Sequence, residues 1–213
     1  MINLVSLNSK ELTPRHMPAH TYARHCGMLT SPANAKNPME ALALGARWAA
    51  DNDCFVEFNP RRILSWLDRY RHIAHTCLWF NTPDVVRNAS ATLFNFWIWQ
   101  PIITAYGFKS AFTLQNGMEQ ERIPWDYCAA VFIGGDDAFK YSQYVRETVT
   151  EARKRSKHVH MGRVNTVQRI TYSKAIGCDS FDGTNYTRYP FDVADHLRLH
   201  QTKDYQLMLG MAA

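Results

Sequence analysis

The chain has 213 residues, 46% of them apolar, which is long enough for one buried core and short for two domains. Its 24 lysines and arginines outnumber its 19 aspartates and glutamates, and a formal net charge of +5 fits a polyanionic partner such as a nucleic acid. No apolar run is long enough to cross a bilayer, and the start of the sequence lacks the pattern of a signal peptide. We therefore expect one cytoplasmic domain over residues 1–213, without a membrane partner.

Short apolar runs alternate with helical patterns along most of the chain. The runs predicted to be strands are Ile2–Leu7, Tyr22–Met28, Arg47–Ala50, Thr76–Phe80, Ser110–Leu114, Ala129–Ile133, Lys157–His160 and Cys178–Phe181. Helices are predicted from the cap Asn59 with Pro60, over Asn88–Ala105 with a bend near Pro101, over Ala138–Arg155, and from the cap Asn165 to Gly177.

Strands separated by helices predict βαβ units and a parallel sheet, so the expected fold class is α/β. Eight strands fit a single small (β/α)8 barrel of the TIM type. An open, doubly wound sheet is the alternative, because Asn8–His20 and Leu29–Ala46 contain prolines and few periodic apolar positions. We do not assign a role to residues 8–46.

The cysteines and histidines give no pattern typical of a metal site. The five cysteines are widely spaced, none forms a Cys-x-x-Cys pair, and we interpret them as reduced thiols. His196 and His200 lie four residues apart on a predicted helix, a spacing that lets two imidazoles share a metal ion. No third ligand accompanies them, so we expect neither a metal nor a cofactor.

Loops with acids, amides and glycines follow several predicted strands. They contain Asp51-Asn52-Asp53-Cys54-Phe55, Asn81-Thr82-Pro83-Asp84, Gln115-Asn116-Gly117, Ile133-Gly134-Gly135, Met161-Gly162 and Asp182-Gly183. Any one of them is more often a turn or a helix cap than a catalytic loop. Because the carboxyl ends of barrel strands meet at one face, their recurrence predicts one polar site there.

Taken in order over about residues 47–190, these loops resemble those of the tRNA-guanine transglycosylase family, most of all its phage-type members that insert 7-deazaguanine bases into DNA. Asp51-Asn52-Asp53-Cys54-Phe55 is similar to the family's Asp-Ser-Gly-Gly-aromatic loop, although Asn52-Asp53-Cys54 replaces Ser-Gly-Gly. Asp179-Ser180-Phe181-Asp182 is similar to the strand that carries the nucleophile. The family's tRNA enzymes bind zinc through a cysteine cluster, and no cysteine follows Cys178 here. The missing zinc-binding subdomain favours DNA over tRNA.

The resemblance implies base exchange at C1′ of a nucleotide, with Asp182 as nucleophile and Asp51 as general acid and base. It implies base recognition by Asp84, Gln115 and the N–H groups of Gly134 and Gly135. Phe55 and Met161 would hold the two faces of the base beside Gly162. Arg163 and Arg188 are expected to contact the nucleic-acid backbone.

We thus expect an enzyme that replaces guanine in double-stranded DNA with a free 7-deazaguanine base (preQ0-like or preQ1-like), acting in the host cytoplasm if a phage encodes it. Two alternatives stay open: a minimal transglycosylase acting on tRNA or other RNA, and a catalytically silent nucleic-acid-binding subunit of a modification complex. A phosphate-binding barrel is disfavoured because Asp182 brings a negative charge to the last loop. Whether the chain forms a homodimer or binds a partner subunit also stays open.

Overall fold

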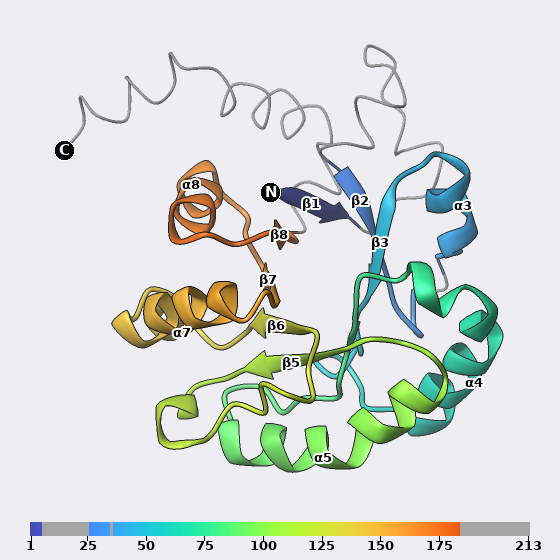
Figure 1. Cartoon of the computed structure of the whole chain (residues 1–213), viewed down its shortest axis with the longest axis horizontal. Coiled ribbons are helices and arrows are strands. Elements are labelled where there is room, and N and C mark those ends of the chain that lie inside the picture. The colour runs from blue at the N-terminus through green and yellow to red at the C-terminus, as the bar shows by residue number, and fades with distance from the viewer. Residues whose placement is uncertain (6–25, 35, 184–213) are drawn as a thin grey trace.

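The computed structural model describes residues 1–5, 26–34 and 36–183, which form an α/β fold of the TIM-barrel type (Figure 1). The parallel strands are β1 (Ile2–Val5), β2 (Cys26–Thr30), β3 (Arg47–Ala50), β4 (Phe80–Asn81), β5 (Ser110–Leu114), β6 (Ala130–Ile133), β7 (His158–Met161) and β8 (Ser180–Phe181). Each strand pairs with the next along the chain, and β8 pairs with β1 through Ile2↔Ser180 and Asn3↔Phe181. The expected α/β, TIM-like architecture is confirmed.

The α-helices lie outside the ring of strands (Figure 1). They are α3 (Pro38–Ala43), α4 (Pro60–Tyr70), α5 (Ala89–Ala105), α6 (Asp137–Lys140), α7 (Gln143–Lys154) and α8 (Val167–Ile176). Two 3₁₀ helices, η1 (Arg71–Thr76) and η2 (Met118–Gln120), complete the described elements. The described chain is not a regular (β/α)8 barrel, because β5 and β6 are joined through η2 alone and β4 and β8 have two residues each. None of the helices in the described ranges is both long and apolar enough to span a bilayer.

The capping residues at the helix ends explain which of the predicted helix bounds are correct. Asn59 caps α4 by accepting a hydrogen bond from the Arg62 N–H at 3.0 Å. Gly177 ends α8 with φ of 100°, a backbone conformation that favours glycine. The cap of α8 is Thr166 rather than Asn165. The helix predicted over Ala138–Arg155 is divided into α6 and α7, because Ser142 caps a new helix.

Two predicted strands have bounds that differ from those in the structure. Thr76–Phe80 was expected to be one strand, but η1 extends to Thr76 and β4 is formed by Phe80 and Asn81. The predicted strand Tyr22–Met28 ends two residues too early, because β2 extends to Thr30; its first four residues lie outside the described part of the chain. The error at Thr76–Phe80 falls on a short apolar segment, where strand and helix patterns are not distinguishable by periodicity.

The alternation of side chains along the strands builds two apolar layers. Side chains such as Trp48, Phe80 and Phe112 belong to the large cluster between the sheet and the helices. A smaller cluster inside the barrel includes Trp79 and Phe132, with small alanines beside them. This inner layer supports the polar groups at the carboxyl ends of the strands.

Candidate functional site

A cavity of about 280 Å³ lies at the carboxyl ends of β3 to β8. It is lined by nine of the eleven residues predicted for the site: Asp51, Phe55, Asp84, Gln115, Gly134, Gly135, Gly162, Arg163 and Asp182. Segments separated by up to about 130 residues of sequence are thus brought to one place, as expected for the catalytic face of a barrel. We take this cavity as the candidate active site.

The other two predicted residues do not line it. Met161 is 2% exposed, and its sulfur accepts a hydrogen bond at 3.0 Å from the Ser173 hydroxyl of α8. Its side chain therefore faces the helices, and the expected contact with a base is wrong. Phe132 lines the cavity instead. Arg188 lies outside the described residues, as do His196 and His200.

Asp182 directly follows β8 and is held as a hydrogen-bond acceptor. Its Oδ1 is 3.1 Å from His160 Nε2 and accepts the backbone N–H of Arg163, also at 3.1 Å. The Asp182 side chain is 23% exposed, whereas that of His160 is fully buried. These contacts hold the Asp182 carboxyl group in one orientation at the cavity, as a nucleophile requires.

Asp51 directly follows β3 and has a different environment. Burial raises the pKa of Asp51 to about 7, and the negative charges of Asp182 and Asp84 add to the rise. The Asn52 N–H, at 2.8 Å from Asp51 Oδ1, and the Asn81 amide, at 3.3 Å, offset the rise only in part. A carboxyl group with a pKa near neutrality can both donate and accept a proton, as a general acid and base must.

The carboxylate of Asp84 is oriented by two buried amides. Asn52 Nδ2 donates to Asp84 Oδ1 at 2.7 Å, and Gln115 Nε2 donates to Asp84 Oδ2 at 2.6 Å. Burial raises the pKa of Asp84, against these hydrogen bonds. A carboxylate has about four acceptor positions, so Asp84 retains capacity for N–H donors of a ligand.

The glycines contribute space rather than donors. The Gly135 N–H donates to Gln115 Oε1 at 2.9 Å, and the Gly134 N–H donates to the Leu114 carbonyl at 2.9 Å. Both N–H groups that we expected to bind a base are thus already used within the protein. A Cβ atom at Gly162 would lie 2.6 Å from the Phe132 ring, so a side chain there would close the floor of the cavity.

Three further residues of the site were missed in the sequence. Lys140, in α6, is buried and donates through Nζ to the Gly162 carbonyl at 2.6 Å. Burial lowers the pKa of Lys140 to about 8, although the charge of Asp182 acts in the opposite direction. Nothing in the local sequence marks Lys140, because its position depends on tertiary packing. His160 and Asn52 could have been found, since each lies in or beside a segment that we singled out.

Phe55 and Arg163 meet at the mouth of the cavity. Phe55 is 63% exposed, and the Arg163 guanidinium lies 3.7 Å from the centre of its ring. Arg163 has a φ of 60°, which is uncommon for a residue with a side chain. The expected backbone-binding arginine therefore stacks on the expected base-binding aromatic ring.

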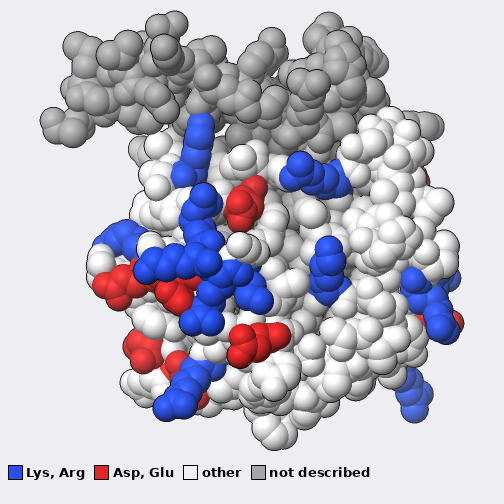
Figure 2. Space-filling model, viewed as in Figure 1, with Lys and Arg blue, Asp and Glu red and all other residues white. Residues whose placement is uncertain are grey.

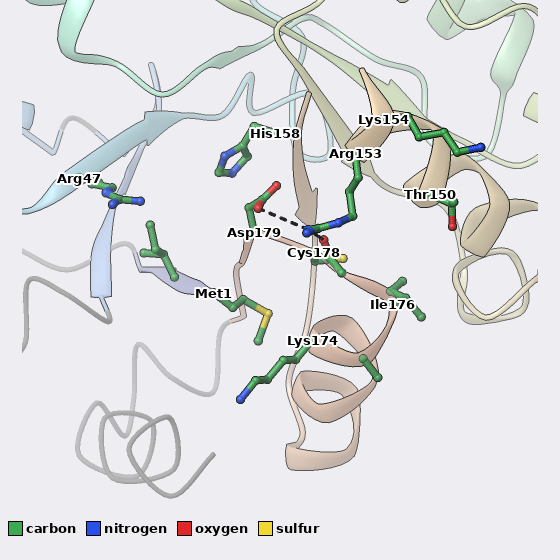
Figure 3. Close-up of a pocket in the computed structure, with 13 residues that line it drawn as sticks. Met1, Arg47, Thr150, Arg153, Lys154, His158, Lys174, Ile176, Cys178 and Asp179 are labelled. Atoms are coloured by element: carbon green, nitrogen blue, oxygen red, sulfur yellow. Dashed lines mark hydrogen bonds and ion pairs between the residues drawn. The ribbon is translucent and has the colours of Figure 1, made fainter. Parts of the chain in front are cut away.

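A larger pocket, of about 830 Å³, lies at the amino ends of β1, β3, β7 and β8 (Figure 3). We call it the basal pocket. Its wall includes Arg47, Arg153 and Lys174, and Arg153 donates to the Gly177 carbonyl at 2.9 Å and lies 3.9 Å from Asp179. Barrel enzymes carry out their chemistry at the opposite end, so its size does not make it the active site.

On the face drawn in Figure 2, lysines and arginines gather over the half of the molecule that contains α7 and α8, with acids among them. Among the residues that the structure describes, no group of three or more His, Cys, Asp or Glu side chains is arranged to hold a metal ion. All five cysteines are free thiols, as predicted.

Comparisons with known proteins give information on the fold and not on the activity. Neither models of protein families nor curated proteins give a match. Among solved structures, one described as "Native KDPGal structure" is 14% identical, with a TM-score of 0.53 over 94% of this chain and 93% of the other. A mandelate oxidase with (S)-2-phenylpropionate is 13% identical, with a TM-score of 0.55 over 93% of this chain and 72% of the other. At such low identity, the similarity supports a TIM-like fold and carries no activity over.

Proposed function

We propose that this chain is a transglycosylase that exchanges guanine in DNA for a 7-deazaguanine base through a covalent bond between Asp182 and the sugar. The observation that carries the proposal is the contrast between two carboxyl groups on one cavity. Asp182 accepts the Arg163 N–H and lies 3.1 Å from His160 Nε2, whereas burial raises the pKa of Asp51 to about 7. A carboxyl group with a pKa near neutrality suits the general acid and base, and the second carboxyl group on the same cavity is then assigned as the nucleophile.

The reaction then has two balanced steps. An oxygen of Asp182 attacks C1′, the bond from C1′ to the guanine nitrogen breaks, and Asp51 gives its proton to the departing guanine. Asp51 next takes a proton from the incoming base, whose nitrogen attacks C1′ and releases the Asp182 carboxylate. Each step is a substitution at C1′, so the sugar keeps its original configuration after both.

The rest of the cavity supports recognition of a guanine-like base. Such a base offers two adjacent N–H donors, and Asp84 is fixed by Asn52 and Gln115 with acceptor capacity to spare. Phe55 and Phe132 offer aromatic surface to a flat ring.

DNA is the proposed partner because the chain has a net charge of +5 and no cysteine cluster like that of the tRNA enzymes. The duplex nucleotide has to be flipped out to reach the cavity, which costs a few kcal/mol. We propose that the reaction takes place in the cytoplasm, and in the host cytoplasm if a phage encodes the chain.

Base exchange tests the proposal directly. The protein is incubated with duplex DNA or, separately, tRNA and with radiolabelled guanine or 7-cyano-7-deazaguanine, and label in the precipitated nucleic acid is counted. Label in DNA is expected with the unaltered protein and with Asp68→Asn, whose carboxyl group is exposed on α4, and no label with Asp182→Asn.

Other outcomes reassign the function. Label in tRNA alone would replace the DNA proposal with the RNA alternative. No label in either, with DNA binding retained in a gel-shift assay, would overturn the enzymatic proposal in favour of a silent binding subunit.

A further inference from the structure

A line of polar side chains runs through the inside of the barrel from the basal pocket to the candidate active site. His158 Nε2 is 2.7 Å from Ser180 Oγ, Ser180 Oγ is 2.8 Å from His160 Nδ1, and His160 Nε2 is 3.1 Å from Asp182 Oδ1. The side chains come from alternate positions of β7 and β8, where His160 pairs with Ser180. We call these four residues the polar column.

The surroundings of the polar column are apolar. The His160 ring lies 4.6 Å from that of Phe132 and 4.9 Å from that of Trp79, measured between ring centres. Both His160 and Ser180 are fully buried. A buried polar group without a partner is unfavourable by about 1–3 kcal/mol, so each hydrogen bond of the column has to be made.

The protons can be assigned from the chemistry of the groups. The Ser180 hydroxyl has a single hydrogen and two imidazole neighbours, so it donates to one ring and accepts from the other. If Asp182 is a carboxylate, His160 donates from Nε2 and its Nδ1 accepts the Ser180 hydrogen. Ser180 then accepts from His158 Nε2–H. All three hydrogen bonds are satisfied in one direction, toward Asp182, without any extra proton.

The charges that face the column agree with this direction. Burial lowers the pKa of His158 to about 4, with Asp179 opposing the shift and His160 and Arg47 adding to it, so its ring is neutral near pH 7. At the other end, Asp182 interacts with the charges of Lys140 and Asp51. Figure 3 shows His158 beside Asp179 at the basal pocket, so the far end of the column meets that pocket.

We propose that Ser180 and His160 are positioning residues for Asp182, because the column fixes the Nε2–H tautomer of His160 and so presents a permanent donor to the carboxylate. The use of that carboxylate as a nucleophile rests on the proposed function; the tautomer does not. A neutral imidazole free to exchange its proton between the two nitrogens would offer Asp182 a lone pair for part of the time, which repels a carboxylate.

Nitrogen NMR of the imidazole rings tests the column in the ligand-free protein. We expect His160 to be the Nε2–H tautomer almost entirely in the unaltered protein, and a mixture of both tautomers in Ser180→Ala. Ser173→Ala is the matched control: it removes another buried serine hydroxyl, which lies on α8 outside the barrel. It should leave the His160 signals unchanged, and Ser180→Thr should restore the single tautomer.

The nitrogen NMR spectrum of the unaltered protein tests the proposed tautomer of His160 even if Ser180→Ala does not fold. A His160 ring protonated mainly on Nδ1 would overturn the proposal, as would a folded Ser180→Ala protein with unchanged His160 signals. In base exchange, Ser180→Ala should lower kcat about tenfold or more with little change in KM.

These two measurements separate the two proposals. The expected tautomer without any base exchange would overturn the proposed function and leave the column in place. Base exchange that proceeds equally well in Ser180→Ala would overturn the positioning role and leave the function in place.

Discussion

Replacing Asp51 with asparagine tests the electrostatics of the cavity without reference to any substrate. Asparagine keeps the size of the side chain and an oxygen that can accept the Asn52 N–H, which lies 2.8 Å from Asp51 Oδ1 in the unaltered protein. It removes the charge. If burial makes that charge unfavourable, Asp51→Asn should be more stable than the unaltered protein wherever Asp51 would be ionised.

The sign and size follow from the pKa values. The pKa of Asp51 is about 7 in the folded protein against 3.8 without the fold. The folded state therefore binds the proton more tightly, and the contribution of Asp51 to stability decreases as pH rises from 3.8 to about 7. The full shift corresponds to about 4 kcal/mol. The carboxylate is enclosed although the residue as a whole is only half-buried, so solvent screening reduces the expected gain to about 2 kcal/mol.

Urea denaturation of both proteins across the pH range measures the effect. The difference in free energy of unfolding between Asp51→Asn and the unaltered protein should be small near about pH 4 and should grow to about 2 kcal/mol near about pH 8. Asp68→Asn, at an exposed site on α4, should show no comparable growth. A constant difference across this range would refute the assignment of a strained charge to Asp51.

Three further outcomes are expected. The stability of the unaltered protein relative to Lys140→Met should rise between about pH 8 and pH 10.5, because the buried ammonium of Lys140 is unfavourable until it loses its proton; urea denaturation of both proteins measures this difference, and a difference that does not change with pH would contradict the reasoning. Gly162→Ala should lower stability by about 1–3 kcal/mol because its Cβ meets Phe132, whereas an unchanged melting temperature would mean that the ring moves aside freely. Phe55→Ala should change stability by less than about 1 kcal/mol, since the ring is 63% exposed, but should weaken guanine binding about tenfold in calorimetry; equal affinity would exclude stacking on Phe55.

Local signals in the sequence were sufficient for the elements that have strong boundaries. Asn59 with Pro60 and the stop at Gly177 predicted two helix ends correctly, because capping depends on neighbouring residues. The run Thr76–Phe80 failed because an apolar segment of that length suits a 3₁₀ helix as well as a strand. Pairing with β3 and β5 limits that strand to two residues, and no local rule contains this information.

The predictions of site residues succeeded and failed for the same kind of reason. The loops after the strands were found because a barrel brings them together whatever the details of packing. Met161 was misassigned although the alternation of β7 could have excluded it: Val159 and Met161 share the outer face, and His160 and Gly162 share the inner one. Lys140 could not have been found, because its ammonium reaches the Gly162 carbonyl only through the packing of α6.

Because Arg163 stacks on Phe55 at the mouth of the cavity, its guanidinium competes with a base for that ring. A base that lies on Phe55 has to displace the Arg163 guanidinium, which is 3.7 Å from the ring centre. A cation–π contact at an exposed position is worth about 0.5–1 kcal/mol, so occupancy by arginine weakens the measured affinity of a base by about two- to fivefold. The displaced guanidinium is then available, at that moment, to a phosphate beside the incoming nucleotide. If the proposed function is correct, loading of the base and capture of the backbone are in this way coupled through Arg163.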